Sequence, residues 1–459
     1  MAKGVRMRQQ RKRLAKGVFY WLVAVVLGSR PGPGWSAADI ALRIGGSEGR
    51  AAEAEKDKVL TLEEAVRIAL ENHPSIAAAR EKVGAQQAVV GQQLAAYYPT
   101  ISMGNSYRTA NVAGTTTSPE AAFDFFTSQA TFDMTLYNFG KREGAVQSSR
   151  DTLDATGYNY KTAVDGVVLG VKQAYYSVLQ ANALLNVREE TVKDRELLLR
   201  QAQGFYEVGT RPKIDVARAE ANLYSAQADR IAAEGALKVA WVTLRNAMGT
   251  PESSERPLAA DPSIGPAPIS LDKAKEAAFG ARPELKGLQA QRKAQDQQIA
   301  TARRGHLPDI FFNANYGRRG NSQRGDTFPL QPTWQVQLSL NIPIFDGFRT
   351  TNKVEEALRT YYSIKAQEEQ QKQQVVLEVE QSYVNIINAQ GRIKATEAAE
   401  RAAKENLDLA NGRYQVGVGS IIEVTDAETT YTSAQTDRIR ALYDYKIAEA
   451  QLAKAIGNP

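Results

Sequence analysis

Side chains that could support catalysis are scarce in this sequence of 459 residues. It contains no cysteine and two histidines, His73 and His306, which stand far apart in the chain. Such isolated histidines form neither a metal-binding group nor an acid–base pair. The sequence also lacks a Walker-type glycine-rich loop and a nucleophile elbow. We therefore expect no enzyme, no cofactor and no metal site, and we interpret both histidines as helix-terminus or interface residues.

Three acidic residues that follow glycine-containing turns are better functional candidates. Asp215 lies after the first turn, and Glu423 and Asp426 lie after the second. Because they are three positions apart, Glu423 and Asp426 share one face if that segment is helical. In a threefold assembly each would form a ring of like charges that favours cations at a narrow aperture. Alternatively, they are solvated acids that interact with a helix dipole.

The elements that carry these acids are two predicted helical hairpins. Their turns are residues 208–212 and 416–420, and helical sequence resumes after each as far as Gly249 and Gly457. No proline interrupts the long segments before the turns, which favours continuous helix. Apolar residues in these segments recur at steps of four and three, which is typical of a coiled coil. They are Val164, Val168, Val171, Tyr175 and Val178, and then Val376, Val379, Tyr383 and Ile386.

The predicted helices are too long for a compact domain. A helix from about Lys141 to about Phe205 would extend roughly 100 Å. Small side chains on its surface indicate packing against several neighbours, and one chain has too few helices to close such a layer. We therefore expect an oligomer.

The whole chain reads as a tandem duplication. Residues 205–209 return as 413–417, and residues 60–65 return as 269–274. The period is far longer than the roughly 20 to 50 residues of a solenoid repeat, so a complete helix-and-strand module occurs twice. The predicted organisation is a signal peptide at 1–38, a flexible lead-in at 39–57, a first repeat at 58–250, a linker at 251–268 and a second repeat at 269–459.

The N-terminus indicates export. Eight of the 57 basic residues and none of the acidic residues precede Asp39, and an apolar run and the small residues 36–38 follow the basic stretch. The run is shorter than the roughly 20 residues of a membrane helix, so we expect cleavage near Ala38; an uncleaved anchor is the alternative. The absence of cysteine excludes a lipid on an N-terminal cysteine. The remaining 49 basic and 51 acidic residues argue against a nucleic-acid partner.

The sequence period changes to two after Pro99 and Pro308. Apolar residues alternate with polar ones from Ile101 to Tyr107, near 131–136, from Ile310 to Tyr316 and from Trp334 to Ile342. Such segments are typical of outer-membrane barrel strands, although two soluble hairpins on a core remain the alternative. Four strands cannot close a barrel in lipid, so several chains must contribute. We expect polar external loops at 109–127 and 319–332.

These motifs together resemble the TolC-like outer membrane efflux protein family. They are the duplication, the Leu-Thr-Leu-Glu-Glu-Ala opening with His73-Pro74, the strand-closing segments at 136–142 and 344–349, and the two Tyr-x-Val-Gly tips. The resemblance implies a mainly α fold in which a homotrimer forms a twelve-stranded outer-membrane β-barrel, four strands per chain, continued by a periplasmic α-helical barrel. It also implies an exit duct for efflux or type I secretion. The implied partners are outer-membrane lipid, a periplasmic adaptor and an inner-membrane transporter of RND, ABC or MFS type.

The resemblance also assigns roles to residues near the tips. Glu423 and Asp426 match the family's acidic aperture ring, and Asp215 and Tyr414 match two positions of the links that hold the aperture shut. Gly419 occupies the position of the family's arginine, and Arg211 in the first tip could compensate. The adaptor-docking positions are matched by Val208, Gly209, Thr210, Val416, Gly417 and Val418. The rival interpretation is a soluble periplasmic coiled-coil scaffold or adaptor, which the strand pattern disfavours.

Overall fold

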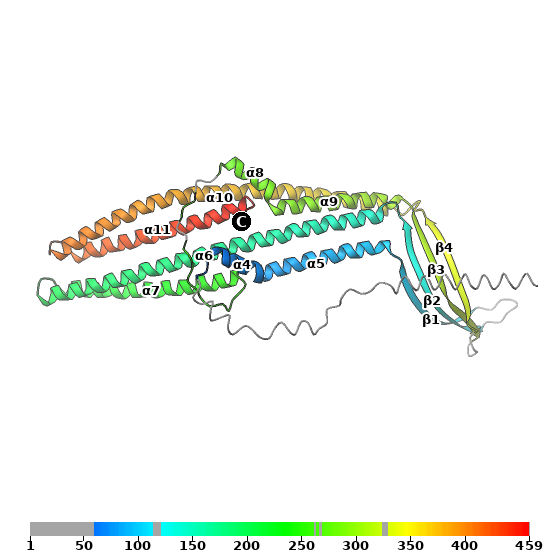
Figure 1. Ribbon diagram of the computed structural model, residues 1–459, viewed down its shortest axis with the longest axis horizontal. Coiled ribbons are helices and arrows are strands. Elements are labelled where there is room, and N and C mark those ends of the chain that lie inside the picture. The colour runs from blue at the N-terminus through cyan, green and yellow to red at the C-terminus, as the bar shows by residue number, and fades with distance from the viewer. Residues whose placement is uncertain (1–58, 113–120, 261–262, 266–268, 324–328, 459) are drawn as a thin grey trace, which may run out of the picture. The chain divides into compact units, whose positions relative to one another are not determined.

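The computed structural model describes residues 59–112, 121–260, 263–265, 269–323 and 329–458. These residues belong to one compact unit, Val59–Pro459. The predicted signal peptide at 1–38 and lead-in at 39–57 lie outside the described residues. Figure 1 shows two sets of helices and a single sheet within this unit.

The helices of the two repeats match in order and in length. The first repeat has helices of 11, 21, 67 and 35 residues, namely α4 (Leu62–Asn72), α5 (Pro74–Leu94), α6 (Lys141–Glu207) and α7 (Lys213–Ala247). The second repeat has the same four lengths, in α8 (Leu271–Ala281), α9 (Pro283–Arg303), α10 (Arg349–Gln415) and α11 (Ile421–Ala455). The predicted long helices and both hairpins are therefore confirmed.

Each long helix packs against its return helix, α6 on α7 and α10 on α11, and α6 also packs on α11 (Figure 1). Most of the predicted coiled-coil positions are buried, whereas Val164, Val376 and Tyr383 are half-buried. Val171, Tyr175 and Val178 are at most 1% exposed, and Val379 and Ile386 are at most 3% exposed. The contact between α6 and α11 joins the two hairpins within one chain.

The four strands form one antiparallel sheet in the order β1 (Thr100–Val112), β2 (Ala121–Tyr137), β3 (Asp309–Gln323) and β4 (Gln331–Asn341). Its register places apolar residues in rows on one face and polar residues in rows on the other. One apolar row is Ile101, Phe132, Ala314 and Val336. The adjacent polar row is Ser102, Thr131, Asn315 and Gln335.

The apolar face of the sheet is uncovered in this unit. Trp334, Leu338 and Met103 are 74%, 68% and 73% exposed. The alternative of two soluble hairpins packed on a core therefore does not describe this sheet. The predicted external loops were too long, because residues 109–112 and 121–127 belong to β1 and β2, and residues 319–323 belong to β3.

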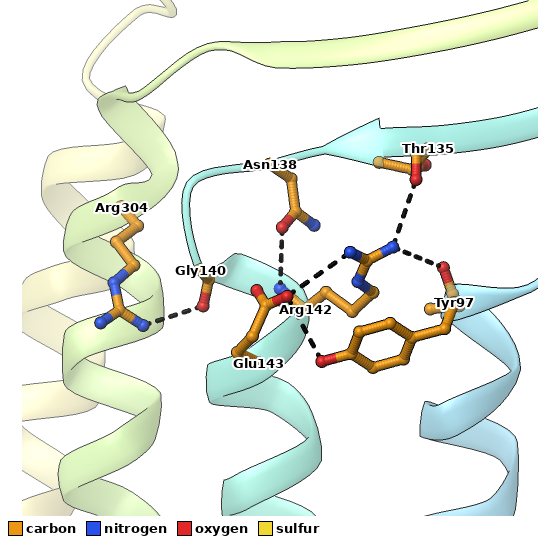
Figure 2. A network of polar contacts seen from close by, with 8 residues as sticks. Tyr97, Thr135, Asn138, Gly140, Arg142, Glu143 and Arg304 are labelled. Carbon is orange, nitrogen blue, oxygen red and sulfur yellow. Dashed lines mark hydrogen bonds and ion pairs between the residues drawn. The ribbon is translucent and has the colours of Figure 1, made fainter.

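A polar network fixes the direction in which α6 leaves the sheet (Figure 2). Arg142 donates hydrogen bonds to the carbonyl oxygens of Thr135 at 3.2 Å and Ala96 at 3.3 Å. Its guanidinium carbon lies 3.9 Å from the centre of the Tyr97 ring. Arg304 of the short helix after α9 donates to the carbonyl oxygen of Gly140 at 2.8 Å. Residues of both repeats therefore hold the strand-to-helix junction.

A second anchor lies where the linker after α7 meets the start of the first repeat. Leu60 and Leu258 form a parallel β-bridge. The buried Tyr175 hydroxyl of α6 lies within hydrogen-bond distance of the carbonyl oxygens of Leu60, at 2.9 Å, and Ala259, at 2.7 Å, and its one proton is shared between them. Because buried carbonyl groups must be hydrogen-bonded, this tyrosine fixes both segments to the middle of α6.

Candidate functional site

The two hairpin tips are built by the same backbone device. α6 and α10 are each followed, two residues after their last helical residue, by a glycine with positive φ, Gly209 at +73° and Gly417 at +84°. The N–H groups of Thr210 and Val418 then donate to the carbonyl oxygens of Phe205 at 2.9 Å and Arg413 at 3.1 Å. This pattern satisfies the last carbonyl groups of the helix and reverses the chain, which a side chain at the glycine would disfavour.

The six residues that the sequence predicts for adaptor docking are exposed at these tips. Val208, Val416 and Val418 are 71%, 73% and 69% exposed, and Gly209, Thr210 and Gly417 are exposed as well. Apolar side chains that stand free at a turn are available to a binding partner.

The structure brings Asp215 and Tyr414 together inside the contact between the hairpins. Tyr414 is 1% exposed, and its ring meets Phe205 edge-on with centroids 5.5 Å apart. Asp215, at the start of α7, is 9% exposed. Burial and, secondarily, the negative charge of Asp215 raise the pKa of Tyr414. The Tyr414 hydroxyl has no hydrogen-bond partner among the described residues, so the two groups are neighbours without a direct bond.

Arg211 joins the first tip to the second. Its Nη2 atom donates to the carbonyl oxygens of Gly419 at 2.6 Å and Gly417 at 3.2 Å. Its guanidinium carbon lies 5.3 Å from the centre of the Tyr414 ring, in range of a cation–π contact. One side chain therefore spans the two hairpins, and the compensation for the missing arginine by Arg211 stays a prediction.

Gly419 has no room for a side chain. A Cβ atom there would lie 2.9 Å from the Cβ of Arg413 and 3.0 Å from backbone atoms of Arg413 and Tyr414. An arginine at position 419 would require the turn to move.

The two acids predicted to form an aperture ring lie at the start of α11. The Ser420 hydroxyl caps this helix by accepting a hydrogen bond from the Glu423 N–H at 3.2 Å. The Glu423 carboxylate lies 3.2 Å from Nε of Arg413, and this pair is exposed. Asp426 is also exposed. The two carboxylates thus stand on the surface of one helix, near its positive end.

Sequence reasoning missed a buried ion pair in the same contact. Arg195 of α6 lies 3.2 Å from Glu428 of α11, with 8% and 6% of their side chains exposed. A signal was present, because Glu428 is placed seven residues after the buried Ile421, and Arg195 is placed seven residues before the buried Ala202. Charged residues at core positions of a heptad pattern are expected to pair.

The histidines and acids of the described ranges do not form a metal site. No three His, Asp or Glu side chains gather there in a way that could hold a metal ion. His73 caps α5, since its Nδ1 accepts a hydrogen bond from the Ser75 N–H at 3.2 Å. Over that part of the chain, none of the helices has the length and apolar character needed to cross a membrane.

Comparison with known structures identifies the fold. The crystal structure of the outer membrane protein VceC from Vibrio cholerae superposes with a TM-score of 0.73 at 20% identity, covering 86% of this chain and 96% of that chain. The four-stranded sheet with two long helical hairpins is thus the fold of TolC-like outer-membrane channels.

The chain belongs to the outer membrane efflux protein family, whose sequence profile matches residues 65–250 and 276–458. The outer membrane protein TolC of Vibrio cholerae is 27% identical over 399 residues, covering 85% of this chain and 89% of that protein. The probable efflux pump outer membrane protein TtgC of Pseudomonas putida is 24% identical over 410 residues, covering 86% of this chain and 83% of that protein.

Proposed function

We propose that this protein is the outer-membrane exit duct of an efflux or secretion system and that it conducts substrates passively. The observation that carries the proposal is the sheet, which has an uncovered apolar face and a polar face and continues into long helical hairpins. Membership of the outer membrane efflux protein family supports the same conclusion. A soluble scaffold would gain nothing from exposed apolar side chains at alternate positions of β4, namely Trp334, Val336, Leu338 and Leu340.

The sheet edges support a homotrimer. β1 pairs only with β2, and β4 only with β3, in the described sheet. An open edge in lipid leaves backbone groups without hydrogen bonds, so the edges must pair with further copies. Three chains would supply twelve strands, within the range of known outer-membrane barrels. The helices would continue the barrel on the periplasmic side. We propose that residues 1–38 are removed on export and that the two repeats have the bounds predicted from the sequence.

The tips then form the inner end of the duct. Arg211, Tyr414 and Asp215 would hold neighbouring hairpins together and keep the aperture narrow. Glu423 and Asp426 would become rings of three carboxylates that favour cations. The exposed tips, centred on Val208, Val416 and Val418, would dock a periplasmic adaptor that links the duct to an inner-membrane transporter. The energy would come from that transporter, because the proposed duct has no catalytic role.

The proposal is tested with the full chain extracted from membranes in detergent and then placed in planar bilayers. We expect an outer-membrane particle with the mass of three chains that conducts ions with cation preference. Glu423→Gln combined with Asp426→Asn should reduce that preference, measured as a smaller reversal potential in a salt gradient. Asp272→Asn with Glu276→Gln, which removes two acids from α8, serves as the control. A soluble monomer would refute the duct, and an unchanged reversal potential would refute the ring.

A further inference from the structure

One pair of opposite charges is buried in the contact between the two hairpins. Arg195 Nη1 lies 3.2 Å from Glu428 Oε2, and the pair lies between α6 and α11. Arg195 also donates a hydrogen bond from Nη2 to the Thr429 hydroxyl at 3.2 Å. The hydroxyl groups of Thr191 and Thr432 meet across the same contact at 3.4 Å. The ion pair therefore links the two halves of the duplication directly.

This environment leaves the Glu428 carboxylate incompletely satisfied. Glu428 Oε1 has no hydrogen-bond partner among the described residues, and Arg195 Nη1 is not aligned to donate one. Burying an ionised carboxylate with a bare oxygen is costly, and a misaligned ion pair offsets only part of that cost. Protonating Glu428 removes the cost of burying the carboxylate charge, while the Arg195 guanidinium keeps its hydrogen bond to Thr429.

The charges around Glu428 act in both directions, and burial has the largest effect. Burial raises the pKa of Glu428 to about 7, an effect that Arg195 opposes and Asp194 of α6 reinforces. Asp194 is exposed, so its contribution is screened by water. One turn further along α11, burial and the negative charges of Glu400 and Asp408 of α10 and of Glu190 of α6 raise the pKa of Tyr431. Two further arginines, Arg188 of α6 and Arg440 of α11, line the same groove as Arg195 and, like it, favour the ionised carboxylate.

The sign of the pH effect follows from this shift. A carboxyl group whose pKa is higher in the packed contact than in water binds its proton more tightly when the contact is packed. Lowering the pH below about 7 therefore favours the packed contact, and raising the pH through that range loosens it.

We propose that Arg195 and Glu428 form a proton-controlled lock between the two hairpins, tight when Glu428 is protonated and loosened when it ionises. Arg195, Thr429 and Thr432 line a polar groove of about 400 Å³ between the hairpins, so the Arg195 side of the pair borders a space that water can enter. Regulation of the aperture width by this lock rests on the proposed function. The pH dependence of the contact between the hairpins is independent of the proposed function.

The test measures the separation of the tips within one chain. Because the sequence lacks cysteine, Thr210→Cys and Val418→Cys place one spin label on each tip. The full-length labelled chain is assembled with an excess of unlabelled chain, and pulsed EPR distances are recorded at about pH 8 and about pH 5.5. We expect the population with separated tips to be on the order of ten-fold larger at the higher pH.

Three variants decide the outcome. Glu428→Gln is neutral at both pH values and should abolish the difference while keeping the tips together. Arg195→Gln should shift the midpoint to higher pH, because the guanidinium no longer favours the ionised carboxylate. Glu220→Gln, which removes an exposed carboxylate from α7, should leave the response unchanged.

A distance distribution that does not respond to pH, or that responds equally in Glu428→Gln, would overturn the lock. Because the measurement reports tip separation and not conduction, this result would leave the proposed duct intact. Conversely, absence of conduction would leave the lock intact.

Discussion

At the scale of single residues, the two tips differ at one repeat-related position, and the two residues at that position are in contact. Arg211 and Gly419 occupy the same position in the two repeats, 208 residues apart. The backbone around Gly419 has no room for a side chain, and its carbonyl oxygen instead accepts a hydrogen bond from Arg211 at 2.6 Å. The first tip thus has an arginine and the second a glycine at this repeat position, and the arginine side chain contacts the backbone of the glycine.

Arg211→Ala should loosen the hairpin tips. It removes two hydrogen bonds from a charged donor, together worth about 2 kcal/mol or more. In planar bilayers, we expect the time spent in open states to rise on the order of ten-fold. Arg218→Ala, which removes an exposed arginine from α7 shortly after the same turn, is the control and should behave like the unmodified protein. Equal conductance of the two variants would contradict the role given to Arg211.

The residue scale is also where the sequence predicted least. The proximity of Asp215 and Tyr414 came from a family resemblance, and their burial could not be read from either residue type. The pairing of Arg195 with Glu428 depends on the register between α6 and α11, which are separated by more than 200 positions. A heptad pattern shows that both side chains point inward but does not show which residues meet.

At the scale of elements, the glycine that ends each return helix is a point of close packing. Gly249 has φ of +72°, and a Cβ atom there would lie 2.8 Å from the Cα of His73 and 2.9 Å from the Asn72 carbonyl oxygen. The end of α7 therefore rests on the backbone of the joint between α4 and α5. Gly457 repeats this arrangement against Ala281 and Arg282.

Gly249→Ala should destabilise the protein by about 1–3 kcal/mol, through backbone strain at a positive φ. The close backbone contact adds to this, since backbone atoms cannot move aside as a flexible side chain can. Gly235→Ala is the matched control, because Gly235 lies inside α7 with nothing within 4 Å of the position that a Cβ atom would take. That change should stabilise the helix by about 0.5–1 kcal/mol. Thermal unfolding in detergent, followed by circular dichroism, should show opposite shifts.

The strands show why element boundaries were harder to predict than element types. Polar composition suggested loops at 109–127, yet β1 and β2 continue into this segment. Thr109 and Asp124 face each other in the register, and the threonine hydroxyl donates to the carboxylate at 2.6 Å. Polar side chains that satisfy one another across strands do not end a sheet, and single-sequence patterns cannot show that pairing.

At the scale of the whole molecule, the helices were predictable because their signals are long and repeated. A proline-free segment with a seam of buried Val171, Tyr175 and Val178 fixes a helix of 67 residues to within a few residues. The need for more than one chain also followed from the sequence, through four strands that cannot close a barrel. The anchoring of the linker at Leu60 and Ala259 could not be predicted from the sequence, because that contact has no periodic signal.

The sheet offers a test of assembly that uses two neighbouring positions. Val336 lies in an apolar row and Gln335 in a polar row, and both are exposed in the single chain. Val336→Lys should place a charge in lipid at a cost of up to about 2–4 kcal/mol per chain and reduce the yield of trimer in outer-membrane fractions. Gln335→Lys faces the other side and should leave that yield unchanged. Equal yields from the two variants would contradict the assignment of the faces.

The buried ion pair has a consequence for the symmetry of any opening motion. At the repeat-related positions, Arg195 corresponds to Ala403 and Glu428 to Glu220, so the duplication does not carry a second copy of the pair. Around the proposed trimer, six similar hairpin contacts would alternate between two chemical kinds, and only those within a chain would sense protons. The aperture would therefore open by the movement of three units, not six, and each unit would consist of hairpins from two different chains.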